Sequence, residues 1–234
     1  MPASRLPDSP AATRTDAVFA ALRAAIVGCE FAPGERLRIE DLGERFGVSS
    51  SPLREALSRL VSLGLVDVFE NRGFRVAPIT VAGMADLTRV RVLVETEALR
   101  DAIAHGDDAW EAGVVAAAHA MSLAEQRLGD APPALDDDWS VRHRAFHLAI
   151  LAGTSSPMLR ALAEQLFDRA ERYRRFAARH AAAPRRKSAE HRQLLDAVLA
   201  RDAERAEALL VRHVTATEKR VVASLLAMDA DGLQ

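Results

Sequence analysis

The sequence predicts a mainly α fold in two parts: a small N-terminal unit of three helices and a β-hairpin, then a C-terminal antiparallel all-α bundle of about six helices. Apolar residues recur at helical spacing along most of the 234 residues. The spacing becomes extended only between Leu65 and Ala77. Pro78 follows directly and disfavours helix in the residue before it, so we expect the boundary between the two parts there.

The composition indicates a folded protein without export or membrane segments. Hydrophobic residues make up 49% and charged residues 27% of the chain, so a packed core is expected. Cys29 is the only cysteine, which excludes a disulfide framework and a thiolate metal cluster. No stretch approaches the roughly 18 apolar residues of a membrane span, and the N-terminus lacks the apolar run of a signal peptide. We therefore expect a cytoplasmic protein with no membrane partner.

The charge balance limits how the protein could bind nucleic acid. The formal net charge is only -2, so DNA binding cannot rest on overall basicity. Any such role has to come from the local placement of a few cations.

Three helices are expected at the start of the chain. Residues 1–14, with three prolines among small and polar residues, are predicted to form a disordered leader. Helical spacing then predicts helices over 15–27, over 39–46, which Gly47 ends, and within 48–65. Two helices joined by a tight turn containing glycine form a helix-turn-helix, whose second helix can enter a DNA groove. Taken alone, the third helix is equally compatible with an ordinary amphipathic surface helix.

The N-terminal tip of the third helix carries polar groups suited to DNA. Ser49, Ser50 and Ser51 offer hydroxyls that can cap the first amides. Pro52 is tolerated there because amides of the first turn have no partner inside the helix. Arg54 follows one turn in, where it can approach base edges and phosphates.

A small hairpin, or wing, is predicted after these helices. Residues 65–69 and 74–77 are short runs rich in β-branched and aromatic residues, separated by 70–73. Arg72 at the tip could follow a DNA backbone or enter a minor groove, because the neighbouring Gly73 allows close approach. An isolated loop arginine is usually just solvated, but after three helices it completes a winged helix-turn-helix. We expect this domain over residues 15–78.

The order of these parts resembles the winged helix-turn-helix domain of the GntR family of bacterial transcription regulators. The resemblance covers about Ala17 to Ile79 and rests on many anchors at fixed spacing: Pro33-Gly34, Arg36-Leu37, Val48-Ser49, Pro52-Leu-Arg-Glu-Ala-Leu57, Arg59-Leu60, Gly64-Leu65 and Arg72-Gly73. It implies that the DNA contacts fall on Ser49, Ser50, Ser51 and Arg54, with Arg72 and Gly73 on the wing. Ser50 departs from the arginine common in the family. Serine cannot make the bidentate guanine contact of arginine, so we expect a different operator.

Beyond Pro78 the pattern is helical only. Helices are predicted at about 80–104, 107–128, 136–151, 157–179, 184–200 and 202–227, with Thr80 as the N-cap of the first. Short connections make neighbouring helices antiparallel. We expect this bundle over residues 79–234.

Four histidines lie on the inward faces of three of these helices. His143 and His147 are four residues apart on one helix, so both rings point the same way. His191 and His213 lie on the apolar stripes of two later helices. Burying several imidazoles without partners is costly, and one shared metal ion would give all four a partner. A single buried histidine is most often a hydrogen-bonded core residue, so a metal-free cluster that holds a ligand or itself by hydrogen bonds stays open.

The region from about Ala82 to Leu225 resembles the FCD ligand-binding domain, the helical effector module of the FadR subgroup of the GntR family. That motif has an acidic residue and a histidine four apart on one helix, then one histidine on each of two later helices, with a divalent ion between them. His147, His191 and His213 match the three histidines, and His143 takes the acidic position. A four-imidazole site favours zinc or nickel, with iron as an alternative, over the harder manganese. The lower anionic charge should help the site accept an anionic effector.

The resemblance implies a small organic acid, a carboxylate metabolite, as the effector. Arg91 has the inward phase of its helix and is the predicted counter-charge, although a structural Arg91–Glu95 pair explains it equally well. Tyr173 is a second candidate for the effector pocket. We therefore predict a metabolite-responsive regulator, a repressor rather than an enzyme. It would bind a palindromic double-stranded DNA operator as a homodimer.

The rival interpretation is a metal-dependent hydrolase or oxygenase that carries a winged helix. An open metal position would be compatible with such chemistry. The sequence offers no evident carboxylate base near the histidines, because Asp136, Asp137 and Asp138 sit at a helix start and suit its dipole.

Overall fold

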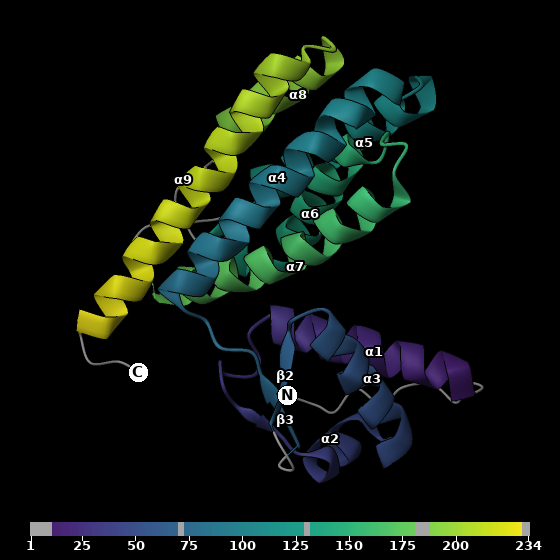
Figure 1. Cartoon of the computed structure of the whole chain (residues 1–234), viewed down its shortest axis with the longest axis vertical. Coiled ribbons are helices and arrows are strands. Elements are labelled where there is room, and N and C mark those ends of the chain that lie inside the picture. The colour runs from purple at the N-terminus through teal and green to yellow at the C-terminus, as the bar shows by residue number, and fades with distance from the viewer. Residues whose placement is uncertain (1–10, 70–72, 129–131, 181–187, 231–234) are drawn as a thin grey trace. The chain divides into compact units, whose positions relative to one another are not determined.

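The computed structural model describes residues 11–69, 73–128, 132–180 and 188–230 (Figure 1). The chain divides into two compact units, Met1–Ile79 and Thr80–Gln234. Each unit has its own apolar core and is described separately. None of the described helices is long and apolar enough to cross a membrane.

Helices α1 (Ala11–Val27), α2 (Ile39–Phe46) and α3 (Ser50–Ser62) form the first unit together with strands β1 (Arg36–Leu37), β2 (Val66–Phe69) and β3 (Gly73–Val76). The three strands make an antiparallel sheet in the order β1-β3-β2, which confirms the predicted winged helix-turn-helix. The apolar stripes of α1 and α3 meet in the core, where seven side chains are fully buried: Val18, Leu22, Ile26, Leu53, Ala56, Leu57 and Leu60.

Two features of this unit differ from the prediction. Helix α1 begins at Ala11, so residues 11–14 of the predicted leader are helical, whereas residues 1–10 lie outside the described residues. Two alanines start this helix, and alanine has the highest helix propensity. Strand β1 was not predicted, because two residues are too short to show alternation. It pairs with β3 far along the chain and buries Leu37.

The turn between α2 and α3 depends on two glycines. Gly47 adopts the left-handed conformation (φ 67°), which glycine tolerates without cost and which ends α2 as predicted. The Gly43 carbonyl accepts the amides of Gly47 (2.9 Å) and Val48 (3.2 Å). A β-carbon at Gly43 would lie 3.1 Å from the Val48 carbonyl oxygen, so a side chain there would press on this turn.

The second unit is the predicted bundle. Within the described residues it consists of α4 (Val81–His105), α5 (Asp108–Arg127), α6 (Asp137–Leu151), α7 (Pro157–His180), α8 (Ser188–Leu199) and α9 (Ala203–Ala230), with a short 3-10 turn, η1 (Pro133–Leu135). Figure 1 shows these helices side by side, with α4 against α7 and α9, α5 against α6, and α8 against α9. Residues 184–187, predicted to begin the fifth helix, lie outside the described residues.

Side chains fix both ends of α4. The Thr80 hydroxyl accepts the Gly83 amide (3.0 Å), which confirms the predicted N-cap. At the other end, the Arg201 guanidinium donates to the carbonyls of Ile103 (3.0 Å) and Gly106 (2.8 Å). Arg201 thereby ties the α8–α9 turn to the α4–α5 turn.

Candidate DNA interface and metal centre

The predicted DNA-reading tip is exposed at the start of α3. Ser49, Ser50, Ser51 and Arg54 all face solvent. Ser49 is the N-cap, but its side chain accepts no hydrogen bond from the first amides, so the serine cap that we predicted is not formed. Within the described residues no hydrogen bond occupies the hydroxyls of these three serines, which are exposed to an incoming partner.

The two arginines of α3 lie in different environments. Arg59 pairs with Asp16 (2.7 Å) and its guanidinium lies 4.0 Å from the centre of the Phe19 ring, which fixes it against α1. No other side chain in the described part of the chain forms a hydrogen bond or ion pair with Arg54. Of these two arginines, only Arg54 is without a side-chain partner among the described residues, so its guanidinium is available to contact DNA.

The wing forms as predicted, with β2 and β3 in register from Val66↔Val76 to Phe69↔Gly73. Gly73 is exposed and left-handed (φ 95°), a conformation that strains other residues. Arg72, predicted to contact DNA, lies outside the described residues. Arg75 covers the Phe69 ring at 4.5 Å from its centre.

The four predicted histidines converge in the bundle. One nitrogen from each ring lies within 4.8 Å of the others, and all four side chains are buried. His143 and His147 come from α6, His191 from α8 and His213 from α9. The ring centres lie between 4.5 Å (His143–His147) and 6.3 Å (His143–His213) apart. The structure therefore contains a cluster that could hold a metal ion.

The donor set fits such an ion. Within the described residues, neither ring nitrogen of His143 or of His147 has a hydrogen-bond partner, and a buried polar atom without one is costly. Zinc binds histidine nitrogens at about 2.0–2.1 Å, which places tetrahedral ligands about 3.4 Å apart. The observed spacing is up to 4.8 Å, so the ring nitrogens would have to approach one another by up to about 1.4 Å to reach that geometry.

Burial and nearby positive charges favour the neutral imidazole form of His143 and His147. Burial lowers the pKa of His143 well below its usual value, and the charge of Arg174 lowers it further. Burial also lowers the pKa of His147, helped by the charges of His213 and His191. Neutral imidazole is the metal-binding form.

Glu190 holds one of the four rings from outside. Its carboxylate lies 3.1 Å from Nδ1 of His213, and its side chain is 28% exposed. When Nδ1–H donates to a carboxylate, Nε2 keeps its lone pair for the cluster.

A small cavity of about 10 Å³ adjoins the cluster. It is lined by three of the histidines and by Arg91, Phe167, Ala170, Glu171, Arg174 and Thr217. This volume holds about one water-sized body. A carboxylate metabolite can therefore enter only when side chains move.

The two predicted effector residues occupy different places. Arg91 lines the cavity, but it also forms a buried bidentate pair with Glu95 (Nε–Oε1 2.6 Å, Nη2–Oε2 3.2 Å). Tyr173 does not line the cavity. Its hydroxyl accepts the Thr80 amide (3.4 Å) at the start of α4.

Sequence reasoning missed Arg174 and Glu171 as cavity residues. They lie at helical spacing from the buried Phe167 and Ala170, so the phase of α7 could have revealed them. The guanidinium of Arg174 lies 4.9 Å from the centre of the Trp139 ring, which stacks on His143 at 4.5 Å.

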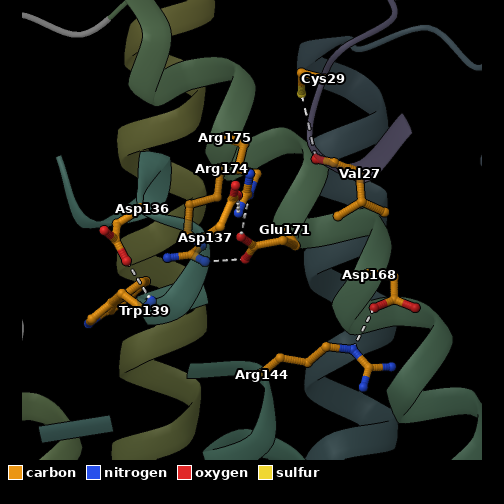
Figure 2. Close-up of polar contacts among 10 residues, drawn as sticks. All are labelled: Val27, Cys29, Asp136, Asp137, Trp139, Arg144, Asp168, Glu171, Arg174 and Arg175. Atoms are coloured by element: carbon orange, nitrogen blue, oxygen red, sulfur yellow. Dashed lines mark hydrogen bonds and ion pairs between the residues drawn. The ribbon is translucent and has the colours of Figure 1, made fainter. Parts of the chain in front are cut away.

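The carboxylates at the start of α6 are engaged in the fold. Asp136 accepts the Trp139 amide (2.7 Å) as the N-cap of α6 (Figure 2). Asp137 pairs with Arg175 (2.7 Å), and Asp138 pairs with Arg142 (2.9 Å). Each of these three carboxylates is therefore engaged by a group of the fold itself.

A winged helix-turn-helix with an exposed third helix, followed by a helical domain with a buried histidine cluster, is the architecture of a DNA-binding transcription regulator. Residues 14–76 match the model of the gntR family of bacterial regulatory proteins, and residues 86–216 match that of the FCD domain. The chain belongs to the GntR family and carries an FCD domain, as its sequence predicted.

Its relatives are named as regulators. The chain is 41% identical over 212 residues to the uncharacterized HTH-type transcriptional regulator BphR of Paraburkholderia xenovorans (strain LB400), covering 91% of this chain and 86% of that protein. It is 40% identical over 193 residues to the HTH-type transcriptional repressor GlaR of Escherichia coli (strain K12), covering 81% and 87%.

A solved structure shares the fold. E. coli McbR/YncC superposes with a TM-score of 0.70 at 23% identity, covering 94% of this chain and 99% of that one. The families and relatives are transcription regulators, which confirms the prediction that this chain is not an enzyme and excludes the rival interpretation.

Proposed function

We propose that this regulator is a repressor that binds a palindromic operator as a homodimer and answers to a small organic acid held at a metal site in its bundle. The name of the similar repressor GlaR supports repression rather than activation. The observation that supports an effector site is the cluster of four buried imidazoles beside a cavity lined by two arginines. As a DNA-binding regulator it would act in the cytoplasm, where the bacterial chromosome lies.

In this proposal Ser49, Ser50, Ser51 and Arg54 read the major groove, and Arg72 and Gly73 place the wing on the backbone. The exposure of the α3 tip and the free Arg54 side chain support this assignment. Two copies are needed because half-sites about one helical turn apart present the same face of DNA to both reading helices.

His143, His147, His191 and His213 would hold the ion. Their nitrogen-only donor set favours zinc or nickel, then iron, over manganese. When bound, the ion supplies a positive Lewis-acid centre that attracts a carboxylate oxygen.

Effector entry has to move helices or side chains, because the cavity is too small for a metabolite. Arg91 and Arg174 both line the cavity, so the anion would enter beside two guanidinium groups. A coupling of about 1–3 kcal/mol between this site and the operator site would change DNA affinity roughly 5- to 150-fold.

Metal analysis of protein purified without an affinity tag, followed by a thermal-shift screen of small carboxylates, tests the proposal. We expect close to one divalent ion per chain and a carboxylate that raises the melting temperature only in metal-loaded protein, because ligand binding adds stability by mass action. A metal-stripped sample that responds equally would show that the cluster binds its effector without an ion.

A further inference from the structure

We infer that Arg174 is the side chain that receives the carboxylate of the effector, and that the Glu171 carboxylate occupies it until the effector arrives. The inference rests on the proposed function and concerns only the group that recognises the anion. Two arginines line the cavity, and their surroundings differ in three ways: their partners, their burial and the cost of releasing them.

Arg91 is fully committed. Its Nε and Nη2 both donate to Glu95, and the two side chains are only 5% and 3% exposed. Breaking this pair would strand the Glu95 carboxylate, which has no second cation among the described residues. A buried charge left alone is strongly destabilising. Arg91 is therefore a poor receiver for an incoming anion.

Arg174 is held more lightly. Its side chain is 13% exposed, and among the described residues only Glu171 accepts a hydrogen bond from it. Its guanidinium covers Trp139, whose ring stacks on His143, so the cation already lies against the histidine cluster. An anion bound to the cluster would lie within reach of this guanidinium.

Glu171 can leave Arg174 without being stranded. Its other oxygen accepts from Arg175 (3.1 Å), and Figure 2 shows the carboxylate between the two guanidinium groups. Arg175 is also anchored by Asp137 (2.7 Å). When an effector carboxylate replaces Glu171 on Arg174, each anion keeps a cation. The exchange therefore avoids the desolvated, unpaired charge that release of Arg91 would create.

Arg174→Gln and Glu171→Gln test the exchange in opposite directions, with Arg144→Gln as a matched control. Arg144 also bridges α6 to α7, through Asp168 (2.8 Å) and Glu164 (2.5 Å), but it does not line the cavity. The probes are zinc alone and a fixed panel of acetate, glycolate, malonate, succinate and citrate, titrated into the zinc-loaded full chain by calorimetry. Melting temperature and zinc affinity of each variant establish that the fold and the ion site are intact.

We expect Arg174→Gln to weaken the best panel carboxylate about 10- to 100-fold, the effect of one charge-assisted hydrogen bond. Glu171→Gln should tighten it by about 5-fold, since a neutral amide competes less well for the guanidinium. Arg144→Gln should leave it unchanged. Wild-type affinity in Arg174→Gln, or weaker binding in Glu171→Gln, would overturn the inference while leaving the proposed function standing. If zinc-loaded wild type binds no panel member, the carboxylate effector itself fails and the inference with it.

Discussion

Arg54 and Arg59 are both exposed cations of one helix, and their partners separate their functions. Arg59 contacts α1 through Asp16 and Phe19, whereas Arg54 is exposed beside the serine tip and has no side-chain partner in the described part of the chain. The sequence could not distinguish them, because the partners of Arg59 come from a helix about 40 residues earlier.

Arg54→Ala should weaken specific operator binding by about 5- to 150-fold per half-site and leave the fold intact. Among the described residues the side chain has no partner whose loss would destabilise the protein, and a good arginine–base contact is worth about 1–3 kcal/mol of discrimination. Fluorescence anisotropy with operator DNA measures the first effect, and circular dichroism checks the second. Unchanged operator affinity would remove this helix from the DNA interface.

Glu190→Ala should weaken metal binding about 10- to 100-fold, as loss of a partner that orients a ligand commonly does. Glu190 accepts from His213 at 3.1 Å and does not itself face the cavity. Competition against a zinc chelator measures the affinity, with Glu190→Gln expected in between because its carbonyl still accepts the hydrogen bond. Equal zinc affinity in all three proteins would refute this role.

At the level of elements, the sequence predicted each long helix and the wing, because apolar periodicity and Gly or Pro punctuation are local signals. It missed β1, whose only evidence is a pairing with β3. It offered Tyr173 only as a second candidate for the effector pocket; in the structure the phase of α7 turns Glu171 and Arg174 to the cavity and the Tyr173 hydroxyl to the start of α4. Much of the surface of α7 is buried. Packing decides which of its faces contacts which neighbouring helix, and a single sequence does not reveal that packing.

Arg201 in the α8–α9 turn stabilises the junction with the end of α4. Arg201→Ala should destabilise the bundle by about 1–3 kcal/mol, because it removes two hydrogen bonds to carbonyls at the end of α4 and the cation over Trp110. Both tryptophans, Trp110 and Trp139, lie in the bundle, so urea unfolding followed by tryptophan fluorescence reports on this unit.

The nearby Arg205→Ala is the control, since Arg205 is exposed and no side-chain interaction holds it within the described residues. An equal, small effect of both substitutions would show that Arg201 does not stabilise the junction.

For the whole molecule, the buried imidazoles make stability depend on pH when no metal is present. Folding lowers the pKa of His143 and His147 below the usual value near 6.5, so the unfolded chain binds more protons. Their contribution is complete above about pH 6.5 and is lost as pH falls through the window below it.

Metal-free protein should therefore melt at a lower temperature at about pH 5.5 than at pH 7.5. His143→Gln combined with His147→Gln should flatten this dependence, and His119→Gln, at an exposed position, should not. A double variant that keeps the wild-type slope would place the titrating groups elsewhere.

In the proposed function, the ion and carboxylate site in the bundle controls operator affinity. The most direct measurement is operator binding by fluorescence anisotropy, with zinc and the best panel carboxylate, for wild type and for His147→Ala combined with His213→Ala. We predict a roughly 5- to 150-fold change in wild type and none in the double variant. An equal change in the double variant, or in chelator-treated wild type, would show that this site does not control operator affinity.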